Sequence, residues 1–158
     1  MDKISKIASF TVDHTVMKPG IYISRVDGDI TTYDLRMKTP NMGDYLSDIE
    51  MHSLEHMLAT YMRNGRIRDR VVYVGPMGCR TGFYVLVRCC DKKEVLTEII
   101  DALEKTVSHT GQMFGYSPVE CGNYRELSVD MAKKCAAEYL DILKGKEHTF
   151  VYPTGEDK

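Results

Sequence analysis

Two histidines and a glutamate lie within five consecutive residues, His52-Ser53-Leu54-Glu55-His56. On a helix, side chains four residues apart are neighbours on one face, so His52 and His56 could bind one metal ion together. Glu55 would then reach the edge of the same site and could carry a proton there. The order H-x-x-E-H is the inverzincin arrangement. The segment predicts either half of a metal site with its own proton carrier or two histidines on an ordinary helix face.

A catalytic zinc or iron centre usually has three protein ligands and one open position, so two histidines leave a site incomplete. Cys79 and Cys121 stand out as further candidates because each abuts a glycine, in Gly75-Pro76-Met77-Gly78-Cys79 and in Cys121-Gly122. A turn at such a position lets a side chain project into a cleft. The spacing alone leaves open what each of these cysteines does.

The other cysteines and histidines are better explained by packing or by helix capping. Cys89-Cys90 end the apolar run Phe83-Tyr84-Val85-Leu86-Val87 and are expected to be strand residues, because a free cysteine behaves as a small buried hydrophobe. Cys135 lies in a predicted C-terminal helix and is expected to pack in the core. His109 and His148 fall near the ends of helix-like stretches, where the helix dipole favours a cation, so both are expected to cap helices at the surface.

A helix must present the two histidines, and the residues around them predict one. Asp44, Ser47 or Asp48 could cap its N-terminus by accepting a hydrogen bond from a free backbone N–H group. Apolar residues then recur at roughly helical spacing until Asn64-Gly65 interrupts the pattern. These residues are Ile49, Leu54, Met57, Leu58 and Tyr61.

The remaining elements alternate between hairpins and helices. Strands are expected at 21–26, 30–36, 71–74 and 81–87, and further helices at 92–108 and from about 125 to 144. The turn Asp27-Gly28-Asp29 joins the first two strands, and an irregular segment at 111–122 delivers Cys121. This order predicts an α+β fold with a mostly antiparallel sheet of about four or more strands covered by helices, as a single domain over residues 1–158.

Composition sets the context for this chemistry. The chain has 158 residues, enough for one sizeable core, and its 21 basic and 23 acidic residues give a net charge of -2, without an electrostatic footprint for nucleic acid. An odd number of cysteines favours reduced thiols over a disulfide framework. Met1-Asp2-Lys3-Ile4-Ser5 lacks the features of a signal peptide, and no apolar run approaches the ~20 residues of a membrane span. We therefore expect a soluble, cytoplasmic protein that binds neither membrane nor nucleic acid.

A set of segments carries a resemblance to a known family. In order, they are Ser9-Phe10-Thr11-Val12-Asp13-His14-Thr15, Asp34-Leu35-Arg36, Pro40-Asn41, His52-Ser53-Leu54-Glu55-His56, Pro76-Met77-Gly78-Cys79-Arg80-Thr81-Gly82-Phe83-Tyr84 and Cys121-Gly122. Together they resemble the S-ribosylhomocysteine lyase, or LuxS, family. The resemblance covers nearly the whole chain, and several motifs in register are far more specific than any one of them.

The resemblance implies a metal site and an assembly. His52, His56 and Cys121 match the ligands of one divalent metal ion per subunit, with water in the open position. The family uses ferrous iron (Fe2+), with Zn2+ or Co2+ as substitutes, and two imidazoles with a thiolate suit all three ions. Family members are homodimers with active sites at the subunit interface, so the resemblance implies the same here.

The resemblance also implies roles for five further residues. Ser9, His14 and Arg36 match positions that hold the substrate, S-ribosylhomocysteine, and the planar guanidinium of Arg36 suits its carboxylate. Glu55 and Cys79 match two proton-transfer residues. The implied reaction moves a carbonyl along the opened ribose and then expels homocysteine by β-elimination, which leaves 4,5-dihydroxy-2,3-pentanedione, the precursor of autoinducer-2. Each carbonyl shift needs one proton removed and another returned.

Two segments depart from the family pattern. Met37-Lys38 stands where the family commonly shows Phe followed by another residue, which removes an aromatic wall at most. Tyr73-Val74-Gly75 stands where Asp-Ile-Ser or a close variant is usual, which removes a carboxylate that could contact the sugar hydroxyls. The departures affect expected substrate positioning rather than the metal ligands or the proton carriers.

Two alternatives remain from the sequence. A small inverzincin-type zinc hydrolase would complete its site with a downstream glutamate, and Glu120 and Glu126 flank Cys121. Such an enzyme gives no reason for the Pro-Met-Gly-Cys turn. A structural zinc would want four protein ligands, with Cys79 as the fourth. Only in that case should Cys79→Ala lose the metal.

Overall fold

A four-stranded antiparallel sheet runs through the computed structural model, which describes residues 3–157. Met1, Asp2 and Lys158, at the ends of the predicted domain, lie outside these described residues. The order in the sheet is β1-β2-β4-β3, and every neighbouring pair is antiparallel. The strands are β1 at Gly20–Asp27, β2 at Ile30–Arg36, β3 at Val71–Pro76 and β4 at Gly82–Arg88.

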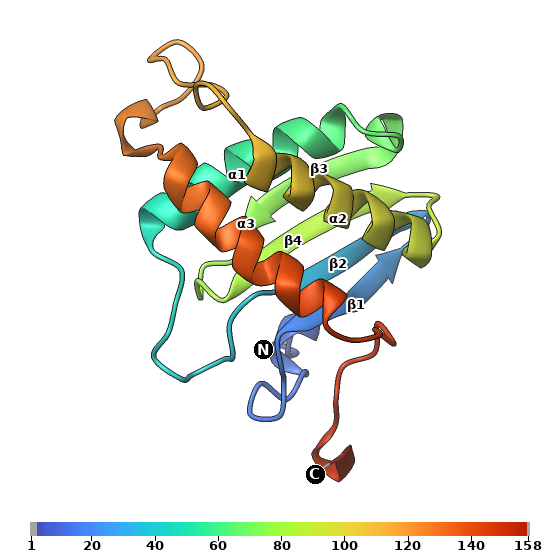
Figure 1. Ribbon diagram of the computed structural model, residues 1–158. Coiled ribbons are helices and arrows are strands. Elements are labelled where there is room, and N and C mark those ends of the chain that lie inside the picture. The colour runs from blue at the N-terminus through green and yellow to red at the C-terminus, as the bar shows by residue number, and fades with distance from the viewer. Residues whose placement is uncertain (1–2, 158) are drawn as a thin grey trace.

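The α-helices of the described residues lie together on one face of this sheet (Figure 1). They are α1 at Asp48–Arg63, α2 at Lys92–Ser108 and α3 at Val129–Lys144. Each helix contacts the other two, and α1 also packs on β3. The predicted α+β fold, with a mostly antiparallel sheet covered by helices, is confirmed.

The two faces of β2 have different surroundings. Tyr33 and Leu35 are 1% and 0% exposed and belong to the core that the helices complete with residues such as Leu54 of α1. Because successive side chains of a strand point to opposite faces, Asp34 and Arg36 lie on the face away from the helices. Both are nevertheless buried, at 1% and 2% exposure. Polar groups in that position need partners: Asp34 and Arg36 bind each other, and Thr81 and Tyr152 supply further hydrogen bonds.

The helix that carries the histidines begins at a capping box. The Ser47 hydroxyl accepts a hydrogen bond from the Glu50 N–H at 3.2 Å, and the Glu50 carboxylate accepts one from the Ser47 N–H at 2.7 Å. Ser47 is therefore the cap among the three that the sequence offered. The helix ends at Arg63, and Asn64 is its C-terminal cap, as the sequence predicted.

Two expectations from the sequence are wrong. β4 ends at Arg88, and Cys89 is exposed with φ +48°, so Cys89-Cys90 turn the chain toward α2 instead of lying buried in a strand. The Cys89 N–H still donates to the Asp29 carbonyl at 2.9 Å, which fixes this turn beside the β1–β2 hairpin. The last helix begins at Val129 and not near 125, because Ser128 caps it.

Candidate metal centre and active site

His52, His56 and Cys121 converge although 69 residues separate His52 from Cys121. One ligand atom from each lies within 4.8 Å of the other two. The Cys121 Sγ is 3.4 Å from Nε2 of His52, and the two imidazole rings meet edge to face with centroids 4.8 Å apart. All three side chains are half-buried. Two imidazoles and a thiol are a donor set that fits iron, zinc or cobalt, with room for a fourth ligand.

The face of α1 that carries the histidines is fixed by the residues packed beneath it. Ser53 and Leu54, between the histidine positions, and Met57, directly after them, are fully buried. The Ser53 hydroxyl accepts a hydrogen bond from the Ser128 N–H at 2.8 Å, which ties α1 to the start of α3. This packing leaves the adjacent face, with His52 and His56, at the boundary with solvent. A metal site there needs no side chain to leave the core.

The orientation of His56 is set by a backbone carbonyl. Its Nδ1 lies 2.7 Å from the carbonyl oxygen of Phe114. A carbonyl only accepts, so Nδ1 carries the proton and Nε2 is the nitrogen left to bind a metal ion. The Phe114 ring is in turn held edge-on by Tyr61 and His109, at centroid distances of 5.3 and 4.9 Å.

His109 caps the C-terminus of α2, as the sequence suggested, but it is half-buried and has a further role. Its Nδ1 lies 2.7 Å from the Tyr61 hydroxyl and its Nε2 lies 2.9 Å from the Gln112 carbonyl. Nε2 must therefore donate to the carbonyl, and Nδ1 accepts from the tyrosine. The ring thus braces the loop that supplies both Cys121 and the Phe114 carbonyl. His148 does cap a helix, since its Nε2 lies 2.9 Å from the Leu143 carbonyl in the last turn of α3.

Gly115 allows this loop to approach His56, and its replacement provides a first prediction. A Cβ at this position would lie 3.0 Å from Nδ1 of His56, and the residue has φ +69°. We expect Gly115→Ala to push the ring aside and to weaken zinc affinity by about 10-fold, as for loss of an outer-shell partner. Gly111→Ala is the matched control, because Gly111 also has positive φ, +98°, but no atom lies within 4 Å of its added Cβ. Competition with a chromophoric chelator measures both affinities, and equal values would contradict this role for Gly115.

Glu55 and the glutamates near Cys121 have different surroundings. No hydrogen bond or ion pair from within residues 3–157 engages the half-buried Glu55 carboxylate. Glu120 accepts a hydrogen bond from the Ser117 hydroxyl at 2.6 Å, and Glu126 accepts one from the Asn123 amide at 2.8 Å. Neither belongs to the ligand group found in the described part of the chain. The structure therefore gives no support to a hydrolase site completed by a glutamate.

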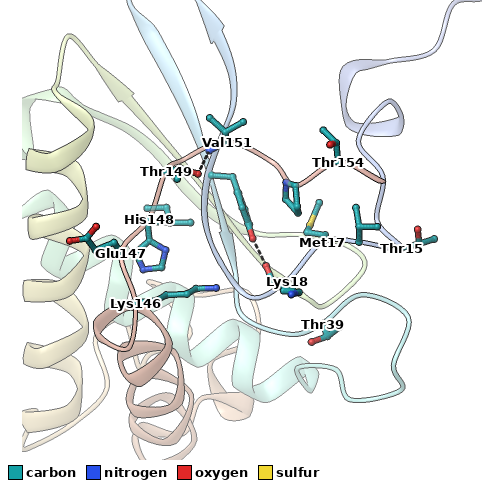
Figure 2. Close-up of a pocket in the computed structure, with 14 residues that line it drawn as sticks. Thr15, Met17, Lys18, Thr39, Lys146, Glu147, His148, Thr149, Val151 and Thr154 are labelled. Carbon is teal, nitrogen blue, oxygen red and sulfur yellow. Dashed lines mark hydrogen bonds between the residues drawn. The ribbon is translucent and has the colours of Figure 1, made fainter. Parts of the chain in front are cut away.

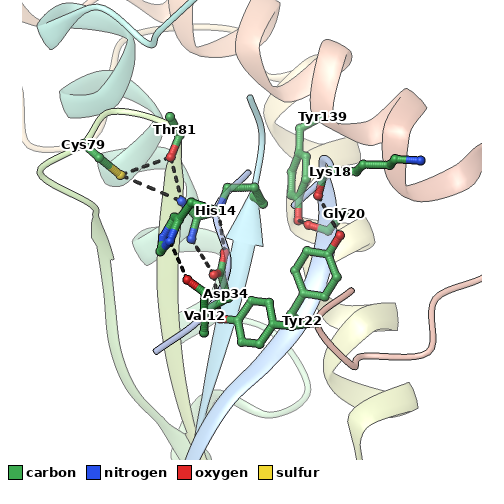
Figure 3. A network of polar contacts seen from close by, with 11 residues as sticks. Val12, His14, Lys18, Gly20, Tyr22, Asp34, Cys79, Thr81 and Tyr139 are labelled. Atoms are coloured by element: carbon green, nitrogen blue, oxygen red, sulfur yellow. Dashed lines mark hydrogen bonds and ion pairs between the residues drawn. The ribbon is translucent and has the colours of Figure 1, made fainter. Parts of the chain in front are cut away.

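A second group of predicted site residues forms around Cys79, in the turn between β3 and β4. The exposed Cys79 sulfur lies 3.1 Å from the Thr81 hydroxyl and 3.8 Å from Nη1 of Arg36 (Figure 3). Arg36 also donates to Thr81 from Nη1 at 2.7 Å. A guanidinium in this place stabilises negative charge on the sulfur.

Arg36 is already paired within the chain. Its Nε and Nη2 donate to the two carboxylate oxygens of Asp34 at 3.1 and 2.6 Å. Burial alone would lower the pKa of Arg36, but the hydrogen bond and negative charge of Asp34 outweigh it and raise that pKa. Asp34 thus occupies one edge of the guanidinium that the resemblance implied for the substrate carboxylate. Nη1, which faces Thr81 and Cys79, is the part of Arg36 directed toward the site.

The N-terminal segment brings the other predicted substrate residues. His14 is half-buried, and its Nδ1 lies 2.9 Å from the Val12 carbonyl, so Nδ1 donates and Nε2 is left for another partner (Figure 3). Ser9 lies in the short helical turn Ala8–Phe10. No hydrogen bond, ion pair or ring contact from within residues 3–157 joins the Cys79 group to the metal ligands. One chain therefore holds the predicted site residues as two separate groups.

A cavity of about 460 Å³ lies elsewhere, between the start of β1 and the C-terminal segment (Figure 2). Lys18, Lys146 and His148 contribute to its lining, and none of the predicted metal, proton-transfer or substrate residues does. Lys146 is tied to the Pro19 carbonyl at 2.7 Å. The cavity is thus separate from the site predicted by the sequence.

The fold and the ligand triad define a class: an α+β protein with a candidate mononuclear centre made by two imidazoles of one helix and a thiol from a distant loop. Residues 7–149 match the family described as S-Ribosylhomocysteinase (LuxS), and the chain belongs to this family. An S-ribosylhomocysteine lyase of Borreliella burgdorferi is 41% identical over 157 residues, which cover 95% of this chain and 100% of that protein. A protein of the same name from Desulfotalea psychrophila is 42% identical, over 96% of this chain and 100% of that protein. Another, from Finegoldia magna, is 38% identical, over 95% of this chain and 99% of that protein.

Proposed function

We propose that the protein is an enzyme that cleaves S-ribosylhomocysteine to homocysteine and 4,5-dihydroxy-2,3-pentanedione. The observation that carries this proposal is the convergence of His52, His56 and Cys121, with ligand atoms within 4.8 Å, in a chain of the LuxS family. Relatives named S-ribosylhomocysteine lyase, matched over 95% of this chain, support the same activity. The site supports one divalent metal ion, for which we propose ferrous iron, with zinc or cobalt as substitutes.

The reaction needs groups that move protons without changing the oxidation level of the substrate overall. The carbonyl of the opened ribose must pass from C1 to C3, and each shift removes a proton from one carbon and returns one to its neighbour. When bound, the metal ion would polarise the substrate carbonyl as a Lewis acid. We assign the proton transfers to Glu55, which no partner within the described residues engages, and to Cys79, whose sulfur faces Nη1 of Arg36 at 3.8 Å.

Ser9, His14 and Arg36 are proposed to hold the substrate. The free Nε2 of His14 and the Ser9 hydroxyl suit the hydroxyl groups of the sugar. Arg36 would act through Nη1, because its other edge binds Asp34 at 2.6 and 3.1 Å. Tyr73-Val74-Gly75 offers no carboxylate to share this work, so sugar binding would depend more on the N-terminal residues than the family pattern suggests.

We further propose that the protein is a homodimer whose active sites lie at the subunit interface. Two features support this: one chain leaves the Cys79 group and the metal ligands unconnected, and the segment around Ser9 exposes large apolar side chains. Ile4, Ile7 and Phe10 are 97%, 57% and 70% exposed. Such a run of apolar surface is typical of a segment that packs on a partner.

Mixed dimers test the composite site. Cys121→Ala and Cys79→Ala homodimers should each be inactive, because each variant damages both sites. When the two variants are co-expressed, random pairing makes half of the dimers mixed, each with one intact site, so about one quarter of the wild-type activity should return. Sedimentation should show a dimer in every sample. Mixed dimers without activity would place each site within a single chain.

Titration of released thiol is the direct test of the proposed activity. Protein purified without oxygen is incubated with S-ribosylhomocysteine, and homocysteine is measured with a thiol reagent. Protein treated with a chelator is the control and should release none. Absence of thiol release by the metal-loaded protein would refute the proposed function.

The products suggest that the reaction makes a signal precursor and recycles homocysteine. We propose that the protein is cytoplasmic. All five cysteines, which lie within the described residues, are free, as is usual in a reducing compartment. No helix among those residues is long and apolar enough to cross a membrane.

A further inference from the structure

The segment after the family match passes the β1 edge of the sheet and reaches the face opposite the helices. The match ends at residue 149, and the Phe150 carbonyl accepts a hydrogen bond from the Ile23 N–H of β1 at 2.8 Å. Phe150 has φ +63°, which turns the chain at this point. Val151 and Pro153 line the cavity of Figure 2, whereas the ring of Tyr152 stacks on Tyr22 with centroids 4.9 Å apart. Tyr152 is thereby held over the buried polar residues of β2.

The Tyr152 hydroxyl completes the coordination of a buried carboxylate. It donates to Oδ2 of Asp34 at 2.7 Å, and the same oxygen accepts from Nη2 of Arg36 at 2.6 Å. Burial first, and then the negative charge of Asp34, raise the pKa of Tyr152, so the phenol keeps its proton and remains a donor. Hydrogen bonds of this kind gain strength in a buried network.

The network leads from the C-terminal segment to the sulfur of Cys79. Asp34 holds two nitrogens of Arg36, which leaves Nη1 directed at the Thr81 hydroxyl, at 2.7 Å, and at the Cys79 sulfur, at 3.8 Å. The negative charge of Asp34 opposes the positive charge that Arg36 presents to the sulfur. The hydrogen bond from the Tyr152 hydroxyl is the third to this carboxylate. It draws the negative charge of Asp34 away from Arg36 and prevents the carboxylate from rotating.

We infer that Tyr152 is a positioning residue for Cys79: its hydroxyl, through Asp34, fixes Arg36 so that Nη1 stabilises a thiolate on Cys79. The inference rests on the proposed role of Cys79 as a proton carrier. Charged and titratable groups near the sulfur include Arg36 and Asp34 of β2 and Tyr84 of β4. Of these, Asp34 is the one that Tyr152 contacts directly.

The test compares two tyrosine variants. Tyr152→Phe keeps the stacked ring and removes the hydroxyl that contacts Asp34. Tyr22→Phe is the matched control, because it keeps the same stack but removes a hydroxyl that donates to the Lys18 carbonyl at 2.6 Å. The measurement is the rate of alkylation by iodoacetamide against pH, read at the Cys79 peptide by mass spectrometry. Reading this peptide separates Cys79 from Cys89, which is also exposed.

We expect the midpoint of the Cys79 profile to rise by about 0.5 pH unit in Tyr152→Phe, which is about 3-fold slower alkylation below the midpoint. Tyr22→Phe should follow the wild-type profile. Superimposable profiles for Tyr152→Phe and wild type would overturn the inference, and so would equal shifts in both variants, which would indicate altered packing. The assay uses no S-ribosylhomocysteine, so a failure of the proposed lyase activity is seen separately, as absent thiol release by the wild-type protein.

Discussion

Cys121→Ala is expected to abolish stoichiometric metal binding, with a loss of zinc affinity greater than the ~10–100-fold that outer-shell changes cause. The thiol is one of three donors whose ligand atoms lie within 4.8 Å of one another. Without it, two imidazoles of one helix must hold the ion alone, and a thiolate is the only anionic donor of the set. His56→Ala should have a similar effect because it removes the nitrogen that the Phe114 carbonyl orients. Metal content by elemental analysis and affinity by chelator competition measure both.

Cys89→Ala is the control for this first prediction. Cys89 is an exposed, free cysteine in the turn after β4, and it does not belong to the ligand group. Its replacement should leave one equivalent of metal bound. A Co2+-loaded sample adds a second measurement, because the thiolate-to-metal charge-transfer absorption should disappear in Cys121→Ala and persist in Cys89→Ala. A full equivalent of metal in both ligand variants would remove the triad from the site.

The sequence predicted the helix and the shared face of its two histidines because both depend on local rules. Ser47 with Glu50 forms the capping box, and residues four apart on a helix share a face, so the positions of His52 and His56 followed from spacing alone. Cys121 could not be placed in this way. It lies 69 positions after His52 in the sequence, and the motif resemblance, not periodicity, singled it out.

Contacts between distant elements account for what the sequence missed. Arg36 and Asp34 are two residues apart on one strand, and their side chains share a face. Their pairing could therefore have been predicted. The contributions of Tyr152, 118 residues from Asp34, and of His109, 48 residues from Tyr61, follow only from tertiary packing. Cys89 was misplaced because an apolar run shows where a strand lies but not where the chain turns away.

The departure from the family pattern at Tyr73-Val74-Gly75 has a structural explanation within this chain. Tyr73 is 52% exposed, and its ring lies over Gly75, where an added Cβ would overlap the phenol. A side chain at position 75 would therefore require the exposed Tyr73 ring to move. In the other departure, Met37 is 5% exposed and packs in the core, and the Lys38 ammonium pairs with Asp44 and Glu138 at 3.2 and 3.5 Å.

The second large effect is expected from Glu55→Gln, which should keep its metal and lose at least ~10²-fold in turnover, as for a lost general base. Glutamine matches glutamate in size and hydrogen bonding but cannot accept a proton. Glu120→Gln is the matched control: Glu120 adjoins Cys121 but is held by the Ser117 hydroxyl at 2.6 Å, so both metal content and turnover should stay at wild-type levels. Loss of metal in Glu120→Gln would instead favour a hydrolase site with a glutamate ligand.

Cys79→Ala completes this prediction, because a proton carrier and a structural ligand behave oppositely. Cys79 contacts Thr81 and Arg36 and lies outside the ligand group, so the variant should retain a full equivalent of metal and lose turnover by a factor similar to that of Glu55→Gln. If the two residues serve successive proton transfers, substrate deuterated at C2 should exchange with solvent in one variant and not necessarily in the other. Thiol release and metal content, measured on both variants, decide the outcome. Near wild-type turnover in either variant would remove the substituted residue from the mechanism. Loss of metal in Cys79→Ala would indicate a closed structural site.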